Sequence, residues 1–127
     1  MPTSDAELLV DRDGYSMTCT INRPQRRNAL TATVVEMLVE ALEEADEDPD
    51  VRLICITGAG DKAFCAGGDL ASDMAGKGVE YTAQTFAKLV VTMDGLGKPM
   101  LARVNGFCMG GGLGLMFAVL CRPWRPH

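Results

Sequence analysis

Five glycines fall within residues 105–115, and three of them, Gly110 to Gly112, are consecutive. Glycine can permit a tight turn, let backbone cradle a phosphate, or aim a bare N–H group at a reacting atom. A second glycine-rich stretch, GAGDKAFCAGGDL, covers residues 58–70. We call residues 58–70 the first glycine segment and residues 105–115 the second glycine segment. For either segment alone, a tight turn or close helix packing also explains the glycines.

The remaining side chains exclude several kinds of catalytic site. The single histidine, His127, is the last residue, so a Ser-His-Asp triad, a Cys-His dyad and an HExxH zinc site all lack their internal histidine. The chemistry open to this chain therefore uses carboxylates, backbone groups or lysine.

Charge and cysteine usage narrow the choice of partners. The net charge of −5 argues against broad binding to nucleic acid or to a membrane surface. No apolar stretch approaches the ~20 residues of a membrane span, and the acidic start of the chain does not resemble a signal peptide.

The cysteines are odd in number and form no CxxC pair, which favours buried thiols in a reducing cytosol over disulfides or a metal site. They are Cys19, Cys55, Cys65, Cys108 and Cys121. We therefore expect a cytoplasmic protein.

The elements before the first glycine segment are a hairpin, a helix and a strand. Residues 8–21 alternate around an Asp13-Gly14 turn, which predicts two antiparallel strands. Residues 34–45 carry apolar side chains on one helical face, with Thr31 and Thr33 as alternative caps. Residues 51–57 are apolar on both faces, as in a central parallel strand.

Further elements follow each glycine segment. The spacing of apolar residues over 86–93 predicts a helix, residues 100–104 form a short strand, and residues 112–120 a last helix. We expect the strands at 51–57 and 100–104 to be adjacent, parallel and buried, so that Ile54 and Leu101 lie in the core. Strands alternating with helices indicate an α/β fold with a mainly parallel sheet and right-handed crossovers. Each glycine segment then lies between a strand and a helix, where open α/β folds place ligands. Two helix N-termini that converge there would offer N–H groups to one oxygen, as in an oxyanion hole.

Three stretches of the chain together resemble the enoyl-CoA hydratase/isomerase (crotonase) family. They are TINRPQRRNALT at 20–31, ITGAGDKAFCAGGDL at 56–70 and KPMLARVNGFCMGGGLGLMFA at 98–118. The resemblance runs from about Leu8 to Cys121. It implies the ββα spiral core of the ClpP/crotonase fold, in truncated form, since the chain has about half the family's usual length. Residues 1–121 would form the N-terminal part of a single crotonase-like domain. Residues 122–127 would be an aberrant or disordered tail, produced by a frameshift or premature stop.

The resemblance also implies a role for two glycines. The family's two oxyanion-hole donors correspond to the N–H groups of Gly68 and Gly111, which would bind the thioester oxygen of an acyl-CoA and stabilise its enolate. Gly110 and Gly112 would give Gly111 room, and Gly106 would allow the turn.

A coenzyme A site follows from the same resemblance. Coenzyme A would enter as part of the substrate, with no separate cofactor and no metal. Arg26 and Arg27 would lie near its phosphates, although a solvated basic loop is the alternative. Asp69 is interpreted as a helix cap rather than a general base. The implied binding residues are Arg26, Arg27, Ala29, Ala66, Gly68, Asp69, Leu70, Ala71 and Gly111.

The sequence departs from the family at the groups that move protons. Hydratases of the family carry a glutamate where this chain has Gly114, and their second acid or base corresponds to a position beyond its last residue. Since proton transfer contributes ~10²–10⁴-fold to rate, we expect little hydration, and an isomerase or one-glutamate parent is favoured. The alternatives are a non-catalytic CoA-binding or assembly remnant of the family and, less favoured, a nucleotide-binding module of another α/β family. The family also implies a homo-oligomer, a trimer or hexamer.

Overall fold

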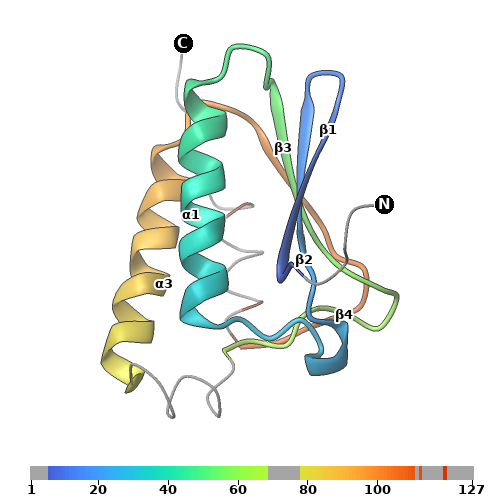
Figure 1. Cartoon of the computed structure of the whole chain (residues 1–127), viewed down its shortest axis with the longest axis vertical. Helices are drawn as coiled ribbons and strands as arrows, with labels where there is room; N and C mark the ends of the chain where they lie inside the picture. The colour runs from blue at the N-terminus through green and yellow to red at the C-terminus, as the bar shows by residue number, and fades with distance from the viewer. Residues whose placement is uncertain (1–5, 69–77, 111, 113–118, 120–127) are drawn as a thin grey trace.

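The fold is a sheet with two helices on one of its faces (Figure 1). The computed structural model describes residues 6–68, 78–110, 112 and 119. Its main sheet has the strand order β1-β2-β3-β5, and a smaller sheet pairs β4 with β6. Within the described ranges, no helix is long and apolar enough to cross a membrane.

Strands β1 (Leu8–Asp13) and β2 (Ser16–Ile21) form the predicted antiparallel hairpin. Gly14 in the turn has a φ of 60°, a left-handed conformation that glycine adopts without strain. The alternation in β2 is confirmed, because Met17, Cys19 and Ile21 are all buried. These side chains point toward the helices.

Helix α1 (Ala32–Glu47) follows the short 3₁₀ turn η1 (Pro24–Arg26) and an extended stretch. Of the two candidate caps, the structure uses Thr31, whose Oγ1 accepts a hydrogen bond from Val34 N at 3.2 Å. The other end is fixed to the sheet by an ion pair between Arg12 and Asp48, and the hydrogen bond from Arg12 lowers the pKa of Asp48. The cap at Thr31 and the ion pair at Asp48 therefore stabilise the two ends of the helix.

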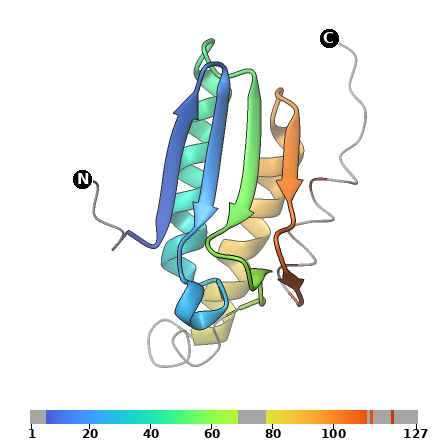
Figure 2. The ribbon, with the colours of Figure 1, turned by 90° about the vertical axis from the view of Figure 1, so that its right-hand side faces the viewer.

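Strand β3 (Leu53–Gly58) lies between β2 and β5 (Met100–Arg103) and is parallel to both, as predicted (Figure 2). Ile54 is fully buried, but Leu101 is 51% exposed, so the expectation that Leu101 is buried is wrong. Strand β5 is the last strand of the described sheet, and Leu101 pairs with Cys55 on the face away from the helices. Only Met100 and Ala102 of β5 pack against the core.

Helix α3 (Gly78–Gly95) packs along α1 and confirms the second amphipathic helix. Leu89 and Met93 are fully buried, whereas Val90 is 37% exposed, so the apolar face is narrower than the sequence indicated. The core fills the space between these two helices and the sheet. Its largest fully buried side chains include Phe64, Ile21, Leu38, Leu42, Ile54, Ile56, Leu89 and Met93.

Each glycine segment contains a short strand that the sequence analysis assigned to loop. Strand β4 (Ala63–Cys65) belongs to the first glycine segment and β6 (Phe107–Cys108) to the second, and the two pair in parallel. Strands of three and two residues show no periodicity, and this pairing joins positions more than 40 residues apart. Residues 112 and 119 are helical, in keeping with the last predicted helix, whose other residues lie outside the described part of the chain.

The choice of cap gives a matched test of the fold. Thr31→Ala should lower the free energy of unfolding by about 1 kcal/mol, since it removes the acceptor of the Val34 N–H. Thr33→Ala, at an exposed position two residues on, should change it by less than about 0.5 kcal/mol. Urea denaturation followed by circular dichroism measures both values. Equal losses for the two variants would contradict the assignment of the cap.

Candidate active site

The backbone of the first glycine segment is held by the side chains of two asparagines. Asn28 Nδ2 donates to the carbonyl oxygens of Ala59 at 3.0 Å and Ala63 at 2.7 Å. Asn105 Nδ2 approaches the same Ala63 oxygen at 3.3 Å and donates to the oxygens of Gly58 and Gly60, both at 2.8 Å. Two loops far apart in the chain therefore meet on one stretch of backbone.

Asn28 itself is placed by a tight loop of residues 23–30. Arg27 and Asn28 have φ of 54° and 56°, the left-handed region that asparagine tolerates better than most residues. Asn28 is fully buried, and its Oδ1 accepts from the Arg23 N–H at 2.9 Å. Arg23 is 6% exposed, and its guanidinium donates to the carbonyl of Ala29 and to Glu7, so it is a structural group.

The same loop runs beside the end of the first glycine segment. The Ala66 N–H donates to the Arg27 carbonyl at 3.1 Å, and the Leu30 N–H donates to the Gly67 carbonyl at 2.7 Å. Leu30 and Gly68 form an isolated parallel bridge. These bonds lead the chain out of buried β4 and onto the surface at Gly68, which is exposed.

The second glycine segment is packed directly on the first. The Phe107 N–H donates to the Lys62 carbonyl at 3.0 Å, and the Met109 N–H donates to the Cys65 carbonyl at 3.1 Å. A Cβ on Gly106 would lie 2.4 Å from the Lys62 oxygen, and one on Gly112 would lie 2.2 Å from the Cys65 oxygen. Both glycines are thus required because backbone passes against backbone.

These contacts correct the role expected for Gly106. Its backbone is not in the left-handed region, so the turn does not require glycine there, whereas the approach to Lys62 does. Gly110 does adopt a φ of 52°, and a Cβ built on it would lie 3.7 Å from the Cα of Gly67. The backbone just before Gly111 therefore lies close to the backbone just before Gly68.

Five of the nine residues expected in the site are described, and they lie together. Arg26 and Arg27 are exposed on the loop, Ala29 is buried beneath it, and Ala66 is half-buried beside it. Gly68 stands at the end of this stretch, with nothing within 4 Å of a Cβ built on it. Within the described part of the chain, no acceptor takes the Gly68 N–H and no donor reaches the Ala66 carbonyl. The other four expected residues, Asp69, Leu70, Ala71 and Gly111, lie outside the described residues.

The thiols near the site are poor nucleophiles at neutral pH. Burial raises the pKa of Cys65 to about 11 and also raises the pKa of half-buried Cys108, its neighbour across the β4–β6 pair. The described cysteines are free, as expected. Among the residues that the structure describes, no group of histidine, cysteine and carboxylate side chains could hold a metal ion.

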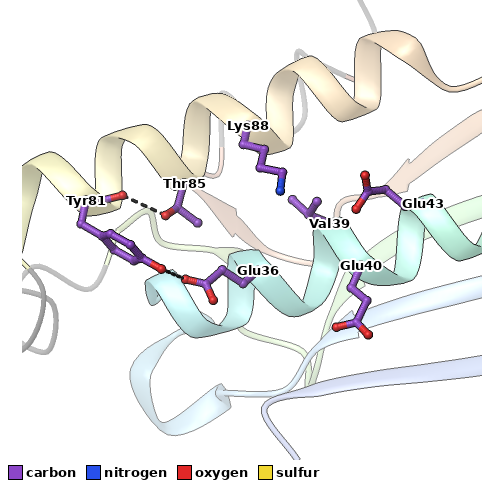
Figure 3. A pocket seen from close by; sticks show the side chains of 7 residues that line it. All are labelled: Glu36, Val39, Glu40, Glu43, Tyr81, Thr85 and Lys88. Carbon is purple, nitrogen blue, oxygen red and sulfur yellow. Dashed lines mark hydrogen bonds between the residues drawn. The ribbon is translucent and has the colours of Figure 1, made fainter.

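One cavity lies away from the glycine segments. It measures about 470 Å³ and lies between α1 and α3, where Tyr81 bonds to Glu36 and Lys88 lies near Val39 and Glu43 (Figure 3). Three glutamates of α1 line this cavity, and no chemistry expected from the sequence falls in it. A smaller cavity of about 200 Å³ adjoins Asn28 and residues 59–63.

Sequence reasoning missed the residues that build the site. In the sequence, Arg23, Asn28 and Asn105 appear only as members of the stretches at 20–31 and 98–118, with no role of their own. Asn28 carried a weak signal, since asparagine is enriched at positive φ. Asn105 precedes a glycine, which indicates a turn but not a side-chain clamp.

Known proteins resemble this chain over most of its length. Residues 16–122 match the family model described as Enoyl-CoA hydratase/isomerase. The mitochondrial 3-hydroxyisobutyryl-CoA hydrolase of Danio rerio is 39% identical over 115 residues, which cover 87% of this chain and 30% of that protein. Its counterpart from Homo sapiens is 38% identical over 114 residues, covering 86% of this chain and 30% of that protein.

Solved structures give the same result. The enoyl-CoA hydratase of Bacillus anthracis superposes with a TM-score of 0.78 at 32% identity, covering 89% of this chain and 45% of that one. An enoyl-CoA hydratase/carnithine racemase of Magnetospirillum magneticum gives 0.81 at 32% identity, covering 89% and 44%. The chain thus spans about a third of the curated relatives, and under half of these solved chains.

The glycine contacts predict an ordered set of stabilities. Gly106→Ala and Gly112→Ala should each lower the free energy of unfolding by about 3 kcal/mol or more, because the new Cβ overlaps backbone that cannot move aside. Gly68→Ala is the matched control and should change it by less than about 0.5 kcal/mol, since the space there is open. Thermal and urea unfolding measure all three. A Gly106→Ala variant as stable as Gly68→Ala would contradict the packing of the two segments.

Proposed function

The chain belongs to the enoyl-CoA hydratase/isomerase family and has the crotonase fold, and on this premise we propose that it binds an acyl-CoA thioester and polarises its carbonyl with the backbone N–H groups of Gly68 and Gly111. The observation that carries the proposal is the surroundings of Gly68. Gly68 is exposed, its N–H takes no acceptor among the described residues, and a Cβ built on it would meet no described atom, while the preceding backbone is fixed by hydrogen bonds. A donor held in this way stabilises developing negative charge without rearranging.

The neighbourhood of Gly68 suits the rest of an acyl-CoA. Arg27 is exposed and forms no salt bridge with any described residue, so its guanidinium is available to a phosphate. The Ala66 carbonyl takes no donor from the described residues and is available to an amine such as that of adenine. In this arrangement coenzyme A lies along residues 26–29 and 66–71, and its thioester lies at Gly68. The homo-oligomer and the cytoplasmic location implied by the sequence remain predictions.

The reaction that follows polarisation depends on which group moves the proton. Gly114 occupies the position where hydratases of the family carry a glutamate, and glycine has no side chain to move a proton. Enoyl-CoA hydration is therefore disfavoured, and isomerisation or thioester hydrolysis is favoured. Hydrolysis has specific support, since the relatives at 38 and 39% identity are CoA thioester hydrolases by name. Binding without turnover is the remaining alternative.

The donor role is tested by comparing ligands with and without a carbonyl. Gly68→Pro deletes the N–H and should weaken binding of an acyl-CoA thioester by about fivefold, the value of one neutral hydrogen bond. It should leave binding of free coenzyme A within about twofold of the wild type. Gly68→Ala keeps the N–H but adds a Cβ beside it, so it should weaken thioester binding less than Gly68→Pro does, and Gly111→Pro should behave like Gly68→Pro. Isothermal titration calorimetry measures the four proteins.

An equal loss of both ligands in Gly68→Pro would mean that the glycine only shapes the loop. Circular dichroism of each variant confirms that it is folded before binding is compared.

The reaction type is tested by two assays on the same preparation. Hydration of crotonyl-CoA, followed by the loss of ultraviolet absorbance of the conjugated thioester, should be negligible because Gly114 offers no carboxylate. Thioester hydrolysis is followed by the release of free thiol from 3-hydroxyacyl-CoA substrates. Hydration at the rate of a full-length hydratase would refute the argument from Gly114.

A further inference from the structure

We propose that Asn105 is a positioning residue that fixes the two glycine segments relative to each other and so determines whether the Gly68 N–H meets the thioester oxygen. This inference rests on the proposed function. It assigns to the side chain of Asn105 a role in recognising the carbonyl, although the side chain itself need not touch the substrate.

The Asn105 amide satisfies a concentrated set of backbone groups. Its Oδ1 accepts from the Gly58 N–H at 3.1 Å, and its Nδ2 donates to the Gly58 and Gly60 carbonyls at 2.8 Å each. The third contact, 3.3 Å to the Ala63 carbonyl, shares one of the two Nδ2 hydrogens. One side chain therefore bonds to both ends of the turn that leads from β3 into β4.

The position of Asn105 in the chain makes this clamp act on both segments. Asn105 is the first residue of the second glycine segment, and its neighbour Gly106 lies against the backbone of Lys62 and Ala63. The β4–β6 pair continues directly from this contact. A shift of Asn105 therefore moves β6 against β4, and β4 is the buried strand that ends three residues before Gly68.

Asn28 offers an informative contrast. It binds the same Ala63 carbonyl, but it belongs to the loop of residues 23–30, and its side chain makes no hydrogen bond with the described residues of the second glycine segment. Asn28 holds the first segment in place, whereas Asn105 joins the two segments. The position of the second glycine segment relative to the first thus depends on Asn105.

The test measures the selectivity of binding for a thioester over its thioether analogue, which lacks the carbonyl. Asn105→Asp keeps the size and the acceptor of the side chain but turns an acceptor toward three carbonyl oxygens, and Asn105→Ala removes the clamp. Both substitutions should lower the selectivity for the thioester by about fivefold, which corresponds to the free energy of one hydrogen bond. Thioether binding should stay within about twofold of the wild type. Asn22→Asp is the matched control, since Asn22 Nδ2 likewise donates to a backbone carbonyl, that of Ala6, and it should leave the selectivity unchanged.

The pH dependence of the selectivity is a second measurement. A variant that is merely less stable would not show the change expected here. In Asn105→Asp the carboxylate faces carbonyl oxygens, which favours the protonated form, and a protonated carboxyl again donates one hydrogen bond. Lowering the pH from about 8 to about 5 should therefore restore part of the selectivity in Asn105→Asp and none in Asn105→Ala.

Thr57→Val serves as a third variant if both Asn105 variants fail to fold. It removes only the hydroxyl bonds to the Arg103 carbonyl and to Asn105 Oδ1, and should lower the selectivity by about twofold.

The outcomes separate this inference from the proposed function. A wild-type chain that does not discriminate between thioether and thioester overturns both. Wild-type discrimination that persists in the variants overturns only the role of Asn105. Equal weakening of both ligands in the variants also overturns it, because Asn105 would then be merely structural. Selective loss of the thioester, with Asn22→Asp unaffected, supports it.

Discussion

The carbonyl oxygen of Ala63 accepts hydrogen bonds from two asparagine side chains, Asn28 at 2.7 Å and Asn105 at 3.3 Å, and the rest of the site depends on that convergence. Gly58 and Ala63, at the two ends of the turn between β3 and β4, are buried, and buried carbonyl groups without partners would cost about 1–3 kcal/mol each. The asparagines supply those partners from two loops that come together only in the folded chain. In doing so they hold β3, β4 and β6 in one arrangement, which leads the chain out to the surface at Gly68.

The glycines follow from the same constraint. Gly58, Gly106 and Gly112 each lie where an added Cβ would approach backbone to within 2.4 Å or less, so close packing excludes any side chain. Gly68 differs because the space beside it is open. The glycines of the two segments therefore have two roles. Some allow one stretch of backbone to pack against another, and others leave space that a ligand can occupy. The proposed oxyanion hole requires both kinds, since a donor is effective only when its support is rigid.

The parts of the fold that depend on local patterns could be predicted from the sequence. The hairpin around Gly14, the face of α1 and the parallel pairing of β3 with β5 are examples, and each follows from periodicity or turn chemistry. Strands β4 and β6 could not be predicted, since two or three residues carry no period and their pairing is non-local. Leu101 was expected to be buried because apolar side chains usually are, but its strand lies at the edge of the described sheet. The site shows the same division. Motifs indicated Ala66 and Gly68, whereas the roles of Arg23, Asn28 and Asn105 depend on bonds that only the folded chain reveals.

The central claim is that a rigid backbone presents N–H groups to a thioester oxygen, and amide NMR tests it most directly. The ¹⁵N-labelled chain is titrated with an acyl-CoA thioester and, separately, with its thioether analogue. The account predicts that the Gly68 and Gly111 amide protons shift downfield with the thioester alone, while amides along residues 26–29 respond to both ligands. Identical shifts of the two glycine amides with both ligands, or no shift of either, would contradict it.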